Sequence, residues 1–404
     1  MKPFYFPNNL IQRETYISRI APFIKKHIVK VLIGQRRVGK SFLLFQLMQR
    51  ILIDDPKANI IYINKEDLAF ENLKTATDLN KYILDHSSDD EMNYIFIDEI
   101  QEIIEFEKAV RSLLLNELND IYITGSNAKM LSGELATLLG GRTIEFKVYS
   151  LSYTEFLTFH QLTDSDLSLL KYFNYGGLPY LINMELTDEM VFEYLKNIYT
   201  TIVYRDVVSR YNIRNTNFLE RLIRFLADNI GSLFSAKRIS DFLKSQQVNI
   251  SNNQILTYTD YLSNAFLIHR VPRYDVVGKR FFEVGEKYYF ENTGIRNCII
   301  GYKPDDLSKL LENVVYNQLI FKGYDVKVGS LRTQEIDFIA TKNNETIYVQ
   351  VALRLDSEKT IEREFGNLLQ IKDNYPKMVV TMDEQFSNTY QGITHVPIRK
   401  FLQM

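Results

Sequence analysis

The stretch GQRRVGKS, residues 34–41, lies between two segments of different character. KHIVKVLIG (26–34) is short and β-rich, whereas KSFLLFQLMQRIL (40–52) has apolar residues at helical spacing. The order of strand, glycine-bounded loop and helix is the context in which the pattern G-x-x-x-x-G-K-S cradles phosphates. The stretch therefore predicts a nucleotide-binding loop. A tight strand-to-helix turn without a ligand is the alternative.

The residue types of this loop suit the chemistry of a Walker A motif. Glycines let backbone N–H groups turn onto phosphates, and the amino end of the next helix adds partial positive charge. Lys40 supplies charge to the β- and γ-phosphates and Ser41 a hydroxyl to Mg²⁺, so ATP and Mg²⁺ are the expected cofactors. For Arg36 and Arg37, the alternative is that only the backbone contacts phosphate while the side chains face a neighbouring molecule or solvent. The predicted nucleotide-binding residues are Gly34, Gln35, Arg36, Arg37, Val38, Gly39, Lys40, Ser41 and Phe42.

Two carboxylates end a buried strand further along the chain. NYIFIDEIQEI (93–103) has four hydrophobic residues in a row, followed by Asp98 and Glu99. Ligands of open α/β sheets bind outside the carboxyl ends of the strands. We expect Asp98 to hold Mg²⁺ through water and Glu99 to orient and polarise the attacking water. A strand that ends in a solvated acidic loop is the alternative.

Two further segments carry candidate catalytic residues. The strand in DIYITGSNAKML (120–131) ends in polar residues, of which Asn127 or Ser126 is placed to contact the γ-phosphate or the lytic water. The same residues are also good helix caps. Arg142 follows two glycines and is a candidate arginine finger for a neighbouring subunit, or an ordinary surface arginine after a helix end.

These motifs in this order resemble a large group of prokaryotic AAA-type ATPases related to the archaeal ATPases. The resemblance implies an AAA-like core that uses the loop and strand-end residues above, and it favours Arg142 as a finger. It supplies no substrate. One departure is VYSLSYTEFL (148–157), where the family usually has Pro before Leu-Ser, which affects a turn and not the chemistry. The matching segments are IQRETYISRI, GQRRVGKS, FIDEIQ, TGSNAKML, LLGGRTIEF, LSYTEFL, YFNYGGLPYLI, LLENVVYNQL and QEIDFIATKNNETIYVQVAL.

Length and composition limit the class of protein. A chain of 404 residues exceeds one ordinary core, so two or three domains are expected. Hydrophobic residues make up 46% and charged residues 24%, which indicates a globular rather than a disordered chain. The single cysteine, Cys298, excludes a disulfide framework and a thiolate metal site. We find no signal peptide and no apolar run long enough to span a bilayer, so a cytoplasmic protein without a membrane partner is expected.

The middle of the chain reads as helices followed by a winged-helix order. Residues 151–230 predict a helical lid, in which Gly176-Gly177 before Pro179 is either a hinge or an ordinary turn. In residues 231–300, two helices precede HRVPRYDVVGKRFFEVGEKYYFEN, which alternates like a hairpin. The net charge of −2 gives no global attraction to nucleic acid, so DNA binding requires a local patch. The candidate DNA-binding residues are Lys237, Arg238, Arg270, Arg273, Lys279 and Arg280; packing against protein is the alternative use of this module.

Residues 301–404 resemble the restriction-endonuclease-like fold. Glu312 lies on a predicted helix, Asp337 in one strand and Gln350 in the next. Such nucleases hold Mg²⁺ between carboxylates and use a lysine to assist water. Here Gln350 replaces a carboxylate and Ala352 stands where the lysine belongs, and nothing in the sequence places Lys342 or Arg354 there. We therefore expect a catalytically degenerate site, although Glu335 and Asp337 share a strand face that can still bind metal weakly.

The sequence thus predicts an α/β protein with four parts. They are a P-loop AAA-like parallel sheet with helices (1–150), a helical lid (151–230), a winged-helix module (231–300) and a restriction-endonuclease-like α/β domain (301–404). The main hypothesis is Mg²⁺-dependent ATP hydrolysis by a homo-oligomer that acts on DNA or a partner protein. A slow nucleotide-dependent regulatory switch is the alternative, and an ATP-dependent nuclease is a third hypothesis.

Overall fold

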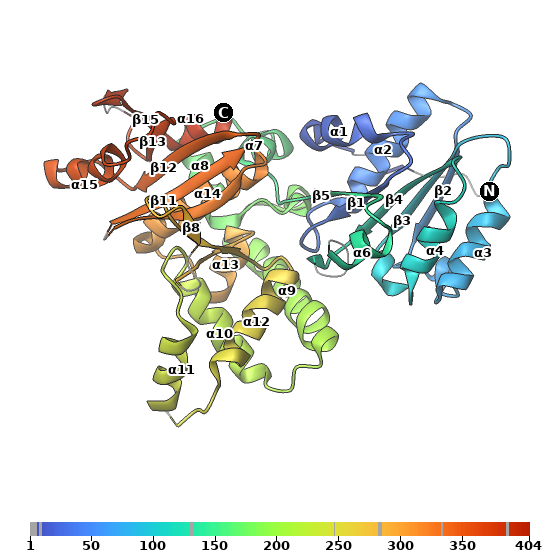
Figure 1. Cartoon of the computed structure of the whole chain (residues 1–404), viewed down its shortest axis with the longest axis horizontal. Coiled ribbons are helices and arrows are strands. Elements are labelled where there is room, and N and C mark those ends of the chain that lie inside the picture. The colour runs from blue at the N-terminus through green and yellow to red at the C-terminus, as the bar shows by residue number, and fades with distance from the viewer. Residues whose placement is uncertain are drawn as a thin grey trace. The chain divides into compact units, whose positions relative to one another are not determined.

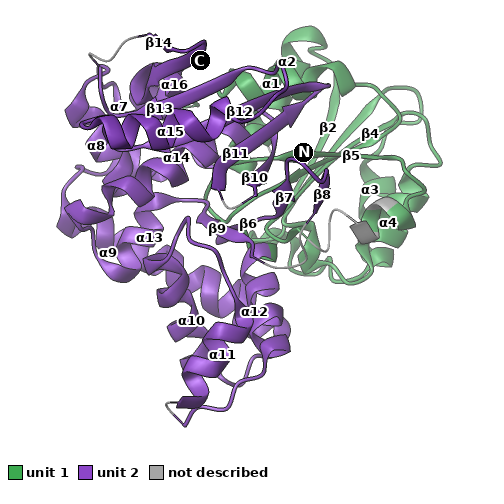
Figure 2. Ribbon diagram, turned by 60° about the vertical axis from the view of Figure 1, so that its left-hand side comes forward, with its two compact units in different colours: residues 1–149, 264–266 green, residues 150–263, 267–404 purple. Residues whose placement is uncertain are grey.

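The chain divides into two compact units, which are coloured separately in Figure 2. Unit 1 consists of residues 1–149 and 264–266, and unit 2 of residues 150–263 and 267–404. The structure is a computed structural model. It describes residues 6–7, 10–128, 133–245, 247–281, 285–332, 334–384 and 388–404.

Unit 1 is built around a parallel sheet whose five strands, in the described residues, have the order β2-β3-β4-β1-β5. Its three inner strands are buried along their whole length, whereas β2 and β5 are partly exposed edges. Helices connect successive strands and cover the sheet (Figure 1), as parallel pairing requires. The strands are β1 (Val29–Ile33), β2 (Asn59–Asn64), β3 (Asn93–Asp98), β4 (Asn119–Gly125) and β5 (Thr143–Lys147). The helices are α1 (Glu14–Ile20), α2 (Lys40–Asp54), α3 (Ala76–His86), α4 (Phe106–Leu113) and α6 (Gly133–Leu138).

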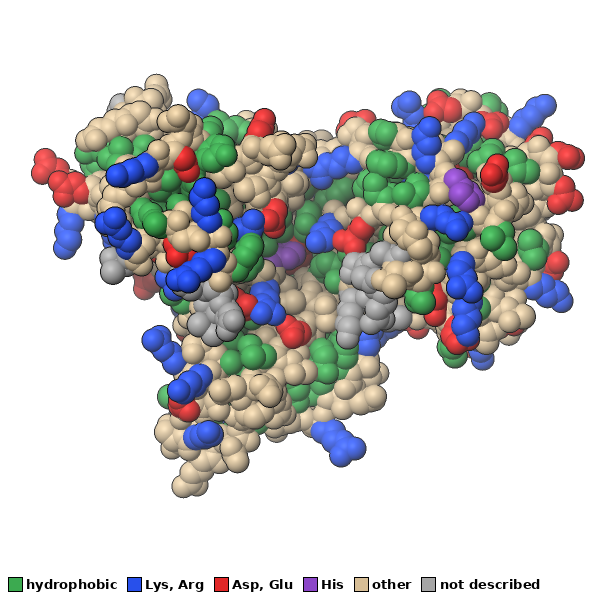
Figure 3. Space-filling view, in the orientation of Figure 1, with side chains coloured by type: hydrophobic (Ala, Val, Ile, Leu, Met, Phe, Trp, Pro, Cys, Tyr) green, Lys and Arg blue, Asp and Glu red, His purple; other side chains and the backbone are tan. Residues whose placement is uncertain are grey.

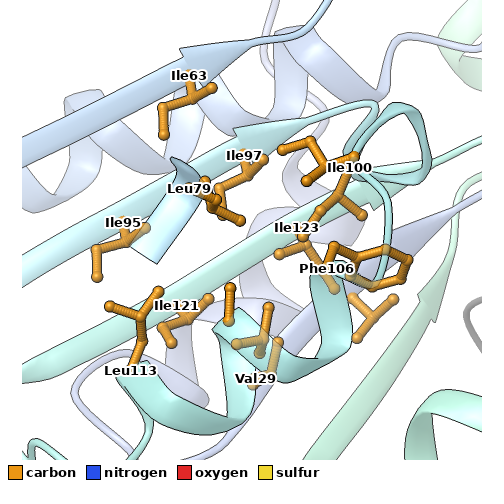
Figure 4. Packing of buried hydrophobic residues seen from close by; sticks show 14 of the residues in the cluster. Val29, Ile63, Leu79, Ile95, Ile97, Ile100, Phe106, Leu113, Ile121 and Ile123 are labelled. Carbon is orange, nitrogen blue, oxygen red and sulfur yellow. The ribbon is translucent and has the colours of Figure 1, made fainter. Parts of the chain in front are cut away.

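The main core of unit 1 lies between one face of this sheet and helices α3 and α4. Alternate strand residues such as Ile95, Ile97 and Ile123 point toward Phe106 of α4 and Leu79 of α3 (Figure 4). Each buried aliphatic side chain of this size contributes about 1.5–3 kcal/mol. This packing holds the strand ends at fixed positions, and the candidate residues follow those ends.

The other face of the sheet contains a buried ion pair between Lys30 and Asp120, whose side chains are fully buried. Asp120 also accepts hydrogen bonds from Tyr122 Oη at 2.8 Å and from the backbone N–H of Lys25 at 2.9 Å. Burial lowers the pKa of Lys30, and the charge of Asp120 acts in the opposite direction. The charged form of Lys30 is therefore stabilised in this buried position by the charge of Asp120.

Asp120→Ala is expected to destabilise unit 1 by about 3–5 kcal/mol, because it leaves the Lys30 ammonium buried without its counter-ion. Urea unfolding followed by circular dichroism measures the effect. Asp85→Ala, at an exposed position of α3, is the matched control. A loss below about 1 kcal/mol for Asp120→Ala would contradict this account of the pair.

Unit 2 begins with helices. The chain forms α7, α8, a 3-10 turn, α9, a π-helical stretch and α10 before the two helices α11 and α12. Within the described residues, no helix combines the length and apolar character that crossing a bilayer requires. The bounds are α7 (Tyr153–His160), α8 (Asp166–Tyr175), η4 (Pro179–Asn183), α9 (Asp188–Thr201), η5 (Ile202–Ser209), α10 (Thr216–Asp228), α11 (Ala236–Ser245), α12 (Asn252–Asn264), α13 (Thr293–Ile300) and α14 (Leu307–Phe321).

The hairpin-like alternation predicted after α12 corresponds to two nested antiparallel strand pairs, which belong to different sheets. β6 (Ile268–Val271) pairs with β9 (Lys287–Phe290), but the intervening β7 (Arg273–Asp275) and β8 (Arg280–Phe281) belong to another sheet. β7 pairs in parallel with β10, so β7 and β8 extend the edge of the C-terminal sheet. Local alternation predicts strands but not their partners. Residues 282–284 of the predicted hairpin lie outside the described residues.

A mixed sheet forms the C-terminal part of unit 2. Its eight strands, in the described residues, have the order β14-β15-β13-β12-β11-β10-β7-β8. Helix α14 contacts β10, β11 and β12, and α15 contacts β11, β12 and β13. The α/β class predicted from the sequence is therefore confirmed. The remaining elements are β10 (Asp325–Leu331), β11 (Gln334–Lys342), β12 (Glu345–Ala352), α15 (Glu358–Leu369), β13 (Lys377–Thr381), β14 (Thr389–Tyr390), β15 (Ile393–Pro397) and α16 (Ile398–Gln403).

Candidate nucleotide-binding site

The loop between β1 and α2 has the backbone geometry that its glycines permit. Gly39 precedes α2 with φ of 95°, a left-handed conformation that side chains rarely adopt. A Cβ added to Gly34 would lie 2.0 Å from the carbonyl oxygen of Val148, so only glycine fits beside that backbone. The loop therefore ends at the amino terminus of a 15-residue helix, where backbone N–H groups and the helix dipole favour an anion.

Lys40 lies inside this loop with only 4% of its surface exposed. Its Nζ donates to the carbonyl oxygens of Gly34 at 3.0 Å and Gln35 at 3.1 Å. The same Nζ lies 3.8 Å from Glu99 Oε1. One ammonium thus links the loop after β1 to the end of β3.

The carboxylates at the end of β3 are buried and surrounded by hydroxyl groups. Asp98 accepts a short hydrogen bond from Thr124 Oγ1 of β4. Burial raises the pKa of Asp98, and hydrogen bonds from Ser41 and Thr124 act against that rise. Ser41, the second residue of α2, is thus among the groups that influence Asp98. A serine hydroxyl and an aspartate beside a lysine are the protein groups that a Mg²⁺–nucleotide complex requires.

Glu99 has a strained backbone, with φ of 56° directly after the strand. Its N–H donates to Thr124 Oγ1 at 3.0 Å, and its carboxylate accepts a short hydrogen bond from Gln101 Nε2. Thr124 thus contacts the Asp98 carboxylate and the Glu99 backbone at once. Sequence reasoning passed over Thr124 because it reads as an ordinary strand residue.

The predicted sensor residues Ser126 and Asn127 are each 1% exposed. Gln101 Nε2 lies 3.5 Å from Ser126 Oγ, which connects Ser126 to the Glu99 carboxylate through one side chain. Residues 129–132, which continue TGSNAKML, lie outside the described residues. The choice between sensor and helix cap therefore stays open.

Arg142 lies at the amino ends of the strands, whereas the loop lies at their carboxyl ends. It precedes β5, its carbonyl oxygen accepts from the N–H of Val29 at 2.9 Å, and its side chain is exposed. Because β1 and β5 are parallel and in register, Arg142 is one strand length, roughly 15 Å, from the carboxyl end of β1. Arg142 therefore cannot complete the loop of its own chain.

Other loop side chains divide between packing and exposure. Arg36 is 6% exposed and its Nη1 lies 3.1 Å from Glu66 Oε1, whereas Arg37 and Phe42 are exposed. Gln35 Nε2 donates to the carbonyl oxygen of Phe266 at 2.8 Å. Val38 is completely buried. The side chain of Val38 is thus not available to a ligand.

Sequence reasoning also missed Arg13. Its guanidinium donates to the carbonyl oxygens of Val38 at 3.0 Å and Tyr149 at 3.1 Å, and only 3% of the residue is exposed. Arg13 therefore links Val38 of the loop to Tyr149. Its sequence separation from Tyr149 leaves no local pattern that would have revealed this contact.

Comparison with known proteins assigns the chain to a family. Its sequence is 40% identical over 383 residues to an uncharacterized protein of Haemophilus influenzae, covering 92% of this chain and 93% of that one. It is 31% identical over 354 residues to an uncharacterized protein of Methanocaldococcus jannaschii, covering 83% and 77%. This chain belongs to the family of these proteins.

Two family descriptions match parts of the chain. Residues 26–157 match the AAA domain family, and residues 166–306 match a domain of unknown function, DUF8612. The first match contains the loop and both strand-end carboxylates, so unit 1 carries an AAA-type ATPase domain. The resemblance stated from the sequence is therefore confirmed for this domain, whereas the nuclease-like assignment of the C-terminal part stays a prediction.

Two solved structures have a low similarity to this chain. The Aeropyrum pernix ORC1 protein in complex with DNA has 11% identity and a TM-score of 0.37, covering 74% of this chain and 94% of that one. AMPPCP-bound DnaA from Aquifex aeolicus has 13% identity and a TM-score of 0.30, covering 64% and 89%. At scores this low, the likeness carries nothing about the ligands or partners of this chain.

The six basic residues predicted to bind DNA do not form one group. Lys237 and Arg238 are exposed on α11, and Lys279 is exposed in the turn between β7 and β8. The other three arginines have partners. Figure 3 has the orientation of Figure 1. In the region where Figure 1 shows α11, the basic side chains on the visible face are separated from one another. Arg270 pairs with Glu286 and Asp260, Arg273 donates to Ser330 Oγ, and Arg280 lies 3.8 Å from Asp275.

The three residues of the predicted nuclease-like site do come together. Glu312 lies on α14, Asp337 on β11 and Gln350 on β12, and Asp337 donates its N–H to Gln350 Oε1 at 3.3 Å. A residue that the sequence did not indicate, Lys287 of β9, lies between Glu312 and Asp337. Ala352 confirms that β12 itself supplies no lysine.

Proposed function

We propose that this protein hydrolyses ATP with Mg²⁺ at the loop after β1. The observation that carries the proposal is the meeting of Lys40, Ser41, Asp98 and Glu99 at the carboxyl ends of β1 and β3. Lys40 would neutralise the β- and γ-phosphates, and Ser41 and Asp98 would hold Mg²⁺ directly and through water. Glu99 would accept the proton of the attacking water or polarise it.

The position of Arg142 supports a homo-oligomer. Since Arg142 cannot reach the loop of its own chain, it acts on nucleotide only when a second copy presents it. A positive charge delivered in this way stabilises the transition state and makes hydrolysis depend on assembly. Asn127, or Ser126 in its place, is proposed as the sensor of the γ-phosphate.

Steady-state phosphate release from ATP tests the activity directly. Turnover is expected with Mg²⁺ and is expected to fall to background in excess EDTA, because Asp98 and Ser41 act through the metal. Adding Mg²⁺ back should restore the rate. Equal turnover with and without EDTA would exclude the proposed metal role.

The target of this activity is DNA or a partner protein. Lys237 and Arg238 on α11 are exposed and support a DNA contact, whereas Arg270 already pairs with Glu286. The proposed parts are a lid over residues 151–230, a winged-helix module over 231–300 and a nuclease-like scaffold over 301–404. ATP turnover with and without linear DNA distinguishes the targets, since only a DNA-directed ATPase is stimulated.

A slow regulatory switch remains the second candidate. The contact from Gln101 to Glu99 supports this candidate, because it restricts the rotation of the Glu99 carboxylate. Single-turnover and steady-state measurements separate the two, because a switch retains bound nucleotide for long times whereas a motor releases product at each cycle.

A further inference from the structure

The C-terminal part of unit 2 contains a cation inside its carboxylate cluster. Nζ of Lys287 lies 2.6 Å from Glu335 Oε1, 3.0 Å from Glu312 Oε1 and 3.7 Å from Asp337 Oδ1. Only 3% of the lysine side chain is exposed. The lysine comes from β9, a strand that pairs with β6 and lies outside the eight-stranded sheet.

The surroundings of the cluster hold this arrangement in place. Tyr289 Oη donates to Glu312 Oε1 at 2.6 Å, and the N–H of Val351 donates to Asp337 Oδ2 at 2.8 Å. A Cβ added to Gly231 would lie 3.0 Å from both Glu312 oxygens, so the backbone closes over that carboxylate. Glu312 lies on α14, Lys287 and Tyr289 on β9, and Glu335 and Asp337 on β11, and these elements are labelled in Figure 2.

We propose that Lys287 is the resident cation of this site, so that its ammonium takes the position that a divalent metal occupies in a metal-dependent nuclease. Mg²⁺ and related metals bind carboxylate oxygens at about 2.0–2.6 Å. A metal in contact with the three carboxylates would overlap the ammonium that already bonds to two of them. The cluster is therefore closed to metal in the folded chain, and the C-terminal part is a scaffold that does not cleave.

The charge balance agrees with this reading of the geometry. Burial alone would lower the pKa of Lys287, but the charges of Glu312, Asp337 and Glu335 outweigh it and raise that pKa. The three carboxylates thus favour the charged ammonium over the neutral amine. Burial and the charge of Glu312 raise the pKa of Asp337 well above its ordinary value. The ammonium thus already balances part of the negative charge that would attract a divalent ion.

Mn²⁺ binding to the nucleotide-free full chain, followed by the electron paramagnetic resonance signal of free Mn²⁺, tests the proposal. Wild type and Asp337→Asn are expected to bind the same amount, because the cluster contributes no site. Lys287→Met should bind one additional Mn²⁺ per chain, and Lys287→Met/Asp337→Asn should lose it again. Lys359→Met, which removes an exposed lysine of α15, is the matched control and should match wild type.

Two results would overturn the proposal. One is Mn²⁺ binding by wild type that Asp337→Asn removes, and the other is a folded Lys287→Met chain that gains no site. Circular dichroism establishes folding, and a bound metal should raise the Tm of Lys287→Met by about 5 °C. If Lys287→Met does not fold, the comparison of wild type with Asp337→Asn still decides. Linear DNA with Mn²⁺ should stay uncut, and cleavage lost in Asp337→Asn would contradict the proposal.

Discussion

Glu99→Gln is expected to bind ATP as tightly as the wild-type chain and to hydrolyse it at least about a hundredfold more slowly. The amide keeps the shape of the side chain and its contact with Gln101, but it cannot accept a proton or polarise water. The neighbouring Lys40 and Asp98 are left to bind nucleotide and metal. Equilibrium binding of a fluorescent ATP analogue and phosphate release under single-turnover conditions measure the two parts separately.

Glu117→Gln provides the matched control for this substitution. Glu117 is an exposed carboxylate of unit 1 in the turn before β4, far from the strand ends that form the site. It should leave both binding and hydrolysis unchanged. Near-normal hydrolysis by Glu99→Gln would show that another group activates the water.

Arg142→Ala is expected to lower ATP turnover by about a thousandfold or more while ATP still binds. The side chain is exposed at the amino end of β5, so its removal disturbs no buried contact of the chain. The loss would therefore reflect the missing charge at a neighbouring subunit's nucleotide. Steady-state phosphate release and the same binding assay give the two quantities.

Arg111→Ala is the control for Arg142→Ala, since Arg111 is an exposed arginine of α4 in the same unit. It should retain wild-type turnover. If Arg142→Ala also retains wild-type turnover, then Arg142 is an ordinary surface residue that follows a helix end.

The part of the site that follows from local sequence could be predicted. A glycine-bounded loop between a strand and a helix, and carboxylates directly after a buried strand, are set by residues adjacent in the chain. Parallel pairing then brings the ends of β1 and β3 to one edge of the sheet. Lys40 and Glu99 meet there, 3.8 Å apart, although 59 positions separate them in the sequence numbering.

Groups brought together only by the tertiary fold could not be predicted. Thr124 contacts the Asp98 carboxylate and the Glu99 backbone from an ordinary strand position, and Arg13 contacts Tyr149 although 136 positions separate them in the sequence. Lys287 belongs to a strand whose sheet the alternating pattern did not specify, so its place among the C-terminal carboxylates left no sequence signal. The split of the predicted hairpin between two sheets has the same cause.

The most direct measurement is ATP turnover by an equimolar mixture of Arg142→Ala and Lys40→Ala chains. Each variant alone should be inactive, because the first lacks the finger and the second lacks the phosphate-binding lysine. In the mixture, an intact loop on the first variant meets an intact Arg142 on the second, and roughly a quarter of the wild-type rate should return on random assembly. A mixture as inactive as its components would contradict hydrolysis completed by a second copy.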